Sequence, residues 1–172
     1  RYLWARSLTQ MRHTVLDNIE AMIVVGGACT GFKGRYAGVV EETLLALQRR
    51  KPVFLLGCMG GAAAAVCEAL LGTVPALLTS SHQLSQKAER EVADYYNDTI
   101  VREDGADDQT PIDHDEVIKA FMAAGPAGLN NGLTADENLI LLTSPLMQEV
   151  LPLLLKGLRN LIPTVPVPVQ KT

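Results

Sequence analysis

The hydrophobic positions in the first half of the chain alternate between helical spacing and short continuous runs. Apolar residues recur at helical spacing between residues 2 and 20, which predicts a helix with one buried face. The runs Met22–Val25 and Val53–Leu56 are fully apolar and predict short strands, and Ala76–Leu78 is a candidate for a third. Glycines and then a helical pattern follow each of the first two runs. This order predicts parallel strands joined by crossover helices.

The second half of the chain is predicted to be mostly helical. A polar amphipathic helix is expected over residues 85–96, and an acidic mobile loop over residues 103–110. Capping boxes at Asp113/Glu116 and Thr134/Glu137 predict two further helix starts, and Ser144-Pro145 precedes a last helix that Pro152 kinks. We therefore predict an α/β fold, with a Rossmann-like parallel sheet, flanking helices and a helical C-terminal half.

Composition limits the domain organisation and the classes of partner. The 172 residues fit one domain, which we place at residues 1–161, with residues 162–172 as a proline-rich tail or linker. Apolar residues make up 48% of the chain and aromatic residues only 5%, so the core is expected to be aliphatic. A net charge of -4 argues against nucleic acid and anionic membranes as partners.

Cysteine and histidine usage points to a cytoplasmic protein without a metal site. The three cysteines are an odd set with no CxxC pair, which suggests a reducing compartment. No apolar run is long enough for a membrane helix. The histidines His13, His82 and His114 lack ligand spacing, so neither a metal nor a cofactor is expected. Cys29 and Cys58 are interpreted as small buried residues rather than nucleophiles.

The first strand is followed by a glycine-rich loop that carries two cations. Glycines let a backbone approach a ligand closely, and a helix N-terminus offers N–H groups to an anion. In open α/β sheets, ligands bind beyond the carboxyl ends of the strands. The alternative interpretation is a tight turn with two solvated cations. The candidate ligand-binding residues here are Gly26, Gly27, Thr30, Gly31, Lys33, Gly34, Arg35 and Gly38.

A second glycine-rich loop, with Gly57, Gly60 and Gly61, follows the second strand. On its own this pattern is explained equally well by close packing of a helix on the sheet. In a parallel sheet, however, it opens on the same side as the first loop. The two loops are therefore expected to form the walls of one cleft, with all three glycines as candidate ligand contacts.

Two adjacent glutamates lie in the first turn of the helix after the first loop. Acidic residues are common there because the helix dipole favours them. In a cleft, Glu42 has a second interpretation, as an acid or base or as an acceptor for ribose hydroxyls. If the helix is rotated by one residue, Glu41 is the candidate for the same role of acid, base or ribose acceptor. Arg12, on the helix before the first strand, is expected to be a solvated surface residue.

Several of these segments resemble a known superfamily. The stretch 38–42 (GVVEE) is similar to the end of the PGGxGTxxE motif of the Lonely-guy (LOG) proteins, and Lys51–Leu56 resembles their Lys-Pro strand. Residues 6–12, 25–27 and 31–36 look closer to another branch of the SLOG (Smf/DprA–LOG) superfamily, the prokaryotic relatives of the TRPM-channel N-terminal domain (LSDAT-like). The resemblance covers residues 1–80, and Asn131-Gly132-Leu133 with Glu137-Asn138 extends it less specifically.

The resemblance implies a Rossmann-like fold and a nucleotide-derived ligand, either ADP-ribose-like or cyclic-nucleotide-like. It also implies a homo-oligomeric sensor in a bacterial defence system, fused to or associated with an effector domain, and further strands upstream of Arg1. Glu42 matches the catalytic glutamate of the LOG enzymes and Arg12 lies near their helical arginine, so a phosphoribohydrolase is the alternative. The missing Pro-Gly-Gly, Val39 in place of Thr, and the insertion with Lys33 argue against it. A scaffold that oligomerises through apolar helices is the third hypothesis.

Overall fold

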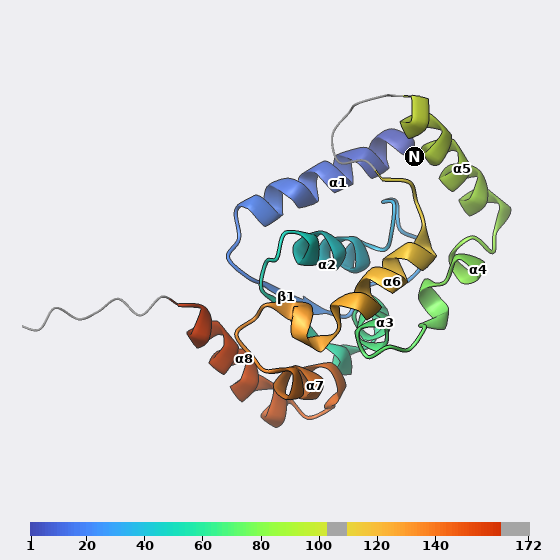
Figure 1. Cartoon of the computed structure of the whole chain (residues 1–172). Helices are drawn as coiled ribbons and strands as arrows, with labels where there is room; N and C mark the ends of the chain where they lie inside the picture. The colour runs from blue at the N-terminus through green and yellow to red at the C-terminus, as the bar shows by residue number, and fades with distance from the viewer. Residues whose placement is uncertain (103–109, 163–172) are drawn as a thin grey trace, which may run out of the picture.

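The computed structural model describes residues 1–102 and 110–162, and Figure 1 shows their arrangement. The acidic segment 103–109 and the proline-rich residues 163–172 lie outside the described residues, so the expectations for them stay untested. The elements in chain order are α1 (Tyr2–Asp17), β1 (Met22–Val25), α2 (Gly38–Gln48), β2 (Val53–Leu56), the 3-10 helix η1 (Gly57–Met59), α3 (Gly61–Leu70), the 3-10 helix η2 (Ala76–Leu78), α4 (Ser80–Gln83), α5 (Lys87–Arg102), α6 (His114–Ala124), the 3-10 helix η3 (Pro126–Leu129), α7 (Ala135–Thr143) and α8 (Met147–Leu161).

The sheet of the described residues has two parallel strands, β1 and β2, in a register that runs from Met22 opposite Val53 to Val25 opposite Leu56. The predicted β–α–β unit with α2 as its crossover is confirmed. A complete Rossmann-like sheet is not present in the part of the chain that the structure describes. The fold is α/β and mostly helical.

The candidate third strand at Ala76–Leu78 is wrong, because this segment forms the 3-10 helix η2. The N–H of Leu78 donates to the carbonyl of Pro75 at 3.0 Å, which closes a tight helical turn. Leu78 is buried, whereas Ala76 and Leu77 are exposed. A single turn of helix buries one of three apolar residues in this way, so a short apolar run does not specify a strand.

The two faces of β2 build two different parts of the core. Val53 and Leu55 face the larger cluster, which includes residues of α2, α3 and α6. Phe54 and Leu56 face a smaller cluster formed with residues of α7 and α8. Every residue of β2 is buried, whereas Ile23 on β1 is 50% exposed. Figure 1 shows α7 and α8 together on one side of the sheet.

Helix starts follow the predicted capping residues closely. The Thr134/Glu137 capping box is confirmed in full at the start of α7. Asp113 caps α6 by accepting hydrogen bonds from the backbone N–H groups of Asp115 and Glu116, both at 3.0 Å. The reciprocal bond of that second box is not made, because the N–H of Asp113 donates to the hydroxyl of Tyr36 at 2.9 Å, while the Glu116 carboxylate pairs with Lys119 at 2.6 Å. Among the described helices, none is both long enough and apolar enough to cross a membrane.

Candidate functional site

The two glycine loops lie side by side at the carboxyl ends of β1 and β2. The backbone N–H of Ala62 donates to the carbonyl of Gly27 at 2.9 Å, and that of Ala63 donates to the carbonyl of Gly26 at 2.8 Å. A Cβ on Gly61, whose φ is +64°, would lie 2.3 Å from the Gly27 oxygen, so this close approach requires glycine. The first amides of α3 are therefore used to join the loops rather than offered to a ligand.

Neither α2 nor α3 has a side-chain cap, but in the described structure no N–H group of the first turn of α2 is joined to a neighbouring loop as those of α3 are. The N–H groups of this turn of α2 are among those that an α-helix cannot satisfy internally, so solvent or a ligand can accept from them. A Cβ on Gly38 would lie 3.2 Å from Nη2 of Arg12. The start of α2 is thus packed directly against the guanidinium group of Arg12.

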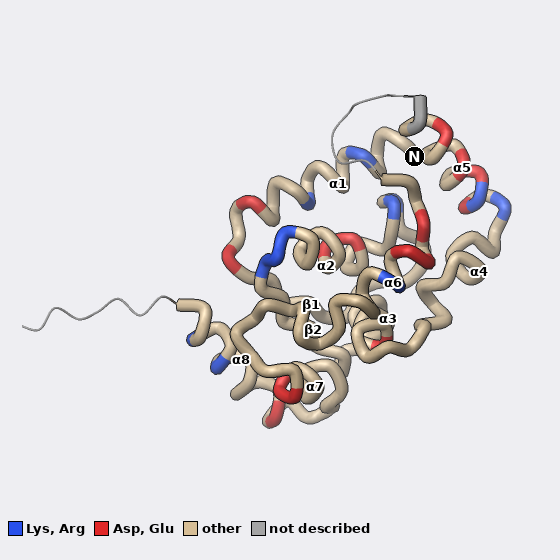
Figure 2. Tube along the Cα trace, in the orientation of Figure 1, with Lys and Arg blue, Asp and Glu red and all other residues tan. Residues whose placement is uncertain are grey.

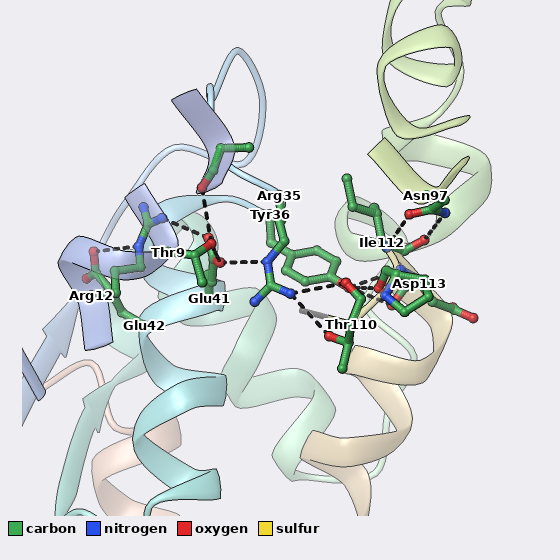
Figure 3. Close-up of polar contacts among 12 residues, drawn as sticks. Thr9, Arg12, Arg35, Tyr36, Glu41, Glu42, Asn97, Thr110, Ile112 and Asp113 are labelled. Carbon is green, nitrogen blue, oxygen red and sulfur yellow. Dashed lines mark hydrogen bonds and ion pairs between the residues drawn. The ribbon is translucent and has the colours of Figure 1, made fainter. Parts of the chain in front are cut away.

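A buried ionic cluster lies behind this loop and joins α1 to α2 (Figure 3). Glu41 is completely buried and accepts three hydrogen bonds: from Oγ1 of Thr9 at 2.5 Å, Nη1 of Arg12 at 2.7 Å and Nε of Arg35 at 2.9 Å. Nε of Arg12 also lies 3.3 Å from Oε1 of Glu42, whose side chain is 39% exposed. Arg12 is only 6% exposed, so the expected surface position is wrong. The sequence pattern misled here because a charge is buried only when it is paired, and the pairing depends on tertiary structure.

The glycine loop is anchored on its other side to the segment before α6. Nη1 of Arg35 donates to the backbone oxygen and to the hydroxyl of Thr110, at 3.2 and 3.1 Å. The hydroxyl of Tyr36 accepts from the N–H of Asp113 at 2.9 Å, and burial raises the pKa of this tyrosine. Asn97 of α5 accepts from the N–H of Ile112 at 2.7 Å, so α5 holds the same segment. The loop is therefore fixed to segments that lie far away in the sequence.

The two cations of the loop have different surroundings. The guanidinium of Arg35 is buried and paired with Glu41 and Thr110, so its donors point into the protein. Lys33 is exposed, and its Nζ lies 5.0 Å above the centre of the Trp4 ring. Figure 2 shows charged residues along α1, α2 and α5, whereas the two strands carry none. Lys33 is thus the cation of this loop that a dissolved anion can reach.

A pocket of about 170 Å³ lies beside the first glycine loop. Thr30 and Gly31, which the sequence singled out, form part of its wall. The remaining lining residues were missed by sequence reasoning, because only the fold brings α4 and the start of α5 to this loop. Those residues are Phe32, His82, Gln83, Ser85, Gln86 and Glu89. They carry no recognisable motif, and their polar composition is ordinary for a surface turn.

Burial disfavours the reactive thiolate form of two of the cysteines. Burial raises the pKa of the Cys67 thiol to about 12 and that of the partly exposed Cys29 thiol to a smaller extent. Such thiols are protonated at neutral pH and are weak nucleophiles. Among the described residues, no group of three or more His, Cys, Asp or Glu side chains is arranged to hold a metal ion.

The fold and the loops define an α/β domain with a parallel β–α–β unit and adjacent glycine-rich strand ends. The family model described as SLOG cluster2 matches residues 1–141, so the chain belongs to the SLOG superfamily. Neither a curated protein nor a solved structure shows a significant match to the chain.

The segment around Asn131 and Asn138, which extends the resemblance less specifically, has a structural role in this fold. Nδ2 of Asn131 donates to the carbonyl of Val53 on β2 and to Oδ1 of Asn138, both at 2.8 Å. The amide of Asn138 in turn donates to the carbonyl of Pro126 at 3.0 Å. These bonds tie the start of α7 to the edge of the sheet.

Proposed function

We propose that the domain binds a nucleotide-derived ligand at the carboxyl edge of its sheet and acts as a sensor rather than an enzyme. The observation that carries the proposal is the joining of the two glycine loops, through Gly26 and Gly27, beside a pocket lined by Thr30 and Gly31. Membership of the SLOG superfamily is consistent with a nucleotide-related function.

Phosphate groups would find donors at the uncapped start of α2 and a cation in Lys33. Glu41 and Arg35 would contribute indirectly, since both are buried and fix the loop instead of contacting a ligand. An ADP-ribose-like or cyclic-nucleotide-like signal, a place near the TRPM-like branch and a role in bacterial defence are the finer parts of this proposal. They rest on the resemblance of residues 1–80.

Thermal unfolding with a panel of nucleotides tests the proposal. A ligand at 100 times its Kd stabilises the folded state by about 2.7 kcal/mol, which corresponds to a rise in Tm of about 5–10 °C for a domain of this size. Lys33→Ala should reduce the rise, because it removes the accessible cation. The matched control Lys156→Ala, on α8 across the sheet, should leave it unchanged. An unchanged Tm with every nucleotide at millimolar concentration would refute ligand binding.

A nucleotide N-glycosidase is the second candidate, and one contact favours it. Arg12 holds the carboxylate of Glu42 at 3.3 Å, and this carboxylate remains partly exposed near the start of α2. In this candidate reaction the carboxylate would take a proton from the water that attacks the anomeric carbon, and the departing base would take up a proton in turn. Release of free base from nucleoside monophosphates, measured by chromatography, should be lost in Glu42→Gln. Release that persists in this variant would remove the assignment.

A further inference from the structure

The pocket beside the first loop is too small for a whole nucleotide. Its volume of about 170 Å³ is below the roughly 300–1,000 Å³ that is usual for sites enclosing a complete small-molecule ligand. We call it the Gln83 pocket, and its wall consists of the lining residues given above. A pocket of this size suits one ring system of a larger ligand, while the rest of that ligand extends along the adjacent loop.

Gln83 is the most deeply buried polar side chain of this wall, with 8% of its surface exposed. Its Nε2 donates to the carbonyl of Cys29 at 2.9 Å and to the carbonyl of Leu77 at 2.6 Å. These two acceptors fix the orientation of the amide, because a flipped side chain would place its oxygen against two carbonyl oxygens.

The oxygen of this amide has no hydrogen-bond donor from the described residues, so it can accept from a ligand in the pocket. Within the described structure, Oε1 of Gln83 accepts no hydrogen bond, although the side chain is more than nine-tenths buried. This oxygen is not fully enclosed, so a ligand donor that reaches it takes the place of water, and the fixed amide sets the direction from which that donor must come. The pocket therefore offers a fixed acceptor in a defined direction.

The other lining groups fit a neutral ring that carries a donor. Phe32 is partly buried and contributes an aromatic side chain. Glu89 adds carboxylate oxygens at the rim, where they also accept from Arg1 at 3.3 and 3.4 Å. In the described structure no Lys or Arg belongs to the wall, so the pocket is poorly suited to phosphate.

We propose that the Gln83 pocket holds a nucleobase with an exocyclic amino group, as in adenine or cytosine, and that this amino group donates to Oε1 of Gln83. The inference rests on the nucleotide-binding function proposed above and names the base that this site selects. An oxo group at the same ring position would place two acceptors against each other, so the corresponding bases should be rejected.

Calorimetric titration of the whole chain with matched ligand pairs tests the inference. The pairs are AMP with IMP, CMP with UMP, and ADP-ribose with its hypoxanthine counterpart, each differing in one amino or oxo group. At least one amino-bearing member should bind about tenfold or more tightly than its partner. Gln83→Met, which has a similar volume but no amide group, should reduce this ratio towards one. Gln86→Met, on the same wall but exposed, should preserve it.

The outcomes separate this inference from the function on which it rests. Equal binding of both members of every pair to the wild-type chain would overturn base selection and leave nucleotide binding intact. A preference that survives undiminished in Gln83→Met would also overturn it. Absence of binding by every nucleotide would overturn the proposed function as well. The wild-type comparison alone is decisive if Gln83→Met does not fold.

Discussion

Replacement of Glu41 by glutamine should destabilise the protein strongly, although the two side chains have nearly the same shape. The amide keeps one acceptor oxygen but turns a donor towards a guanidinium group, and two buried arginines lose their shared counter-charge. Removing one partner of a buried ion pair costs about 3–5 kcal/mol. That is a large part of the roughly 5–15 kcal/mol that stabilises a typical domain.

Equilibrium unfolding in urea measures the effect, with Glu42→Gln as the matched control. Glu42 lies next in the chain and contacts the same arginine, but its side chain is 39% exposed, so its loss should cost about 1 kcal/mol or less. The slope of the transition should stay the same while its midpoint falls. If Glu41→Gln costs no more than Glu42→Gln, the interpretation of the ionic cluster as the anchor of the loop is refuted.

Three other predictions concern the loops, the sheet and pH. Gly61→Ala should lower Tm far more than Gly60→Ala: both residues have positive φ, but only at Gly61 does a Cβ meet a carbonyl oxygen, at 2.3 Å. Phe54→Ala should cost about 3–5 kcal/mol in urea unfolding, whereas Ile23→Ala, at a half-exposed site, should cost under about 1 kcal/mol. Burial lowers the pKa of His114, so its contribution to stability is present above its unfolded pKa of about 6.5 and is lost as pH falls through its lower folded pKa. The fall in Tm on acidification should be smaller in His114→Phe, and an equal fall would contradict this assignment.

The local elements of this fold were largely predictable from the sequence, because they depend on short-range signals. The alternation of apolar runs with glycines predicts strands at Met22–Val25 and Val53–Leu56, and the structure has both strands with these bounds. Capping residues such as Thr134 marked helix starts because their side chains bond to amides two or three residues away. The adjacency of the two glycine loops followed from parallel pairing alone.

The burial of individual polar side chains was not predictable in the same way. Arg12 is separated from Glu41 by a complete strand and a loop, so no local pattern shows that their charges meet. The Gln83 pocket depends on the position of α4, which the segment after α3 determines. Ala76–Leu78 shows the same limit for backbone structure, since three apolar residues suit a strand or a helical turn until the surrounding core is known.

Asn131 makes the two borders of the two-stranded sheet unequal. Its amide occupies the carbonyl of Val53 at the outer border of β2, where the main chain of another strand would otherwise bond. On the opposite border, the main chains of Ile23 and Val25 face away from β2, because Met22 is the residue whose N–H donates towards it. A side chain thus covers the border of β2 at Val53, whereas among the described residues no hydrogen bond is made to the main chains of Ile23 and Val25, where a further strand could pair.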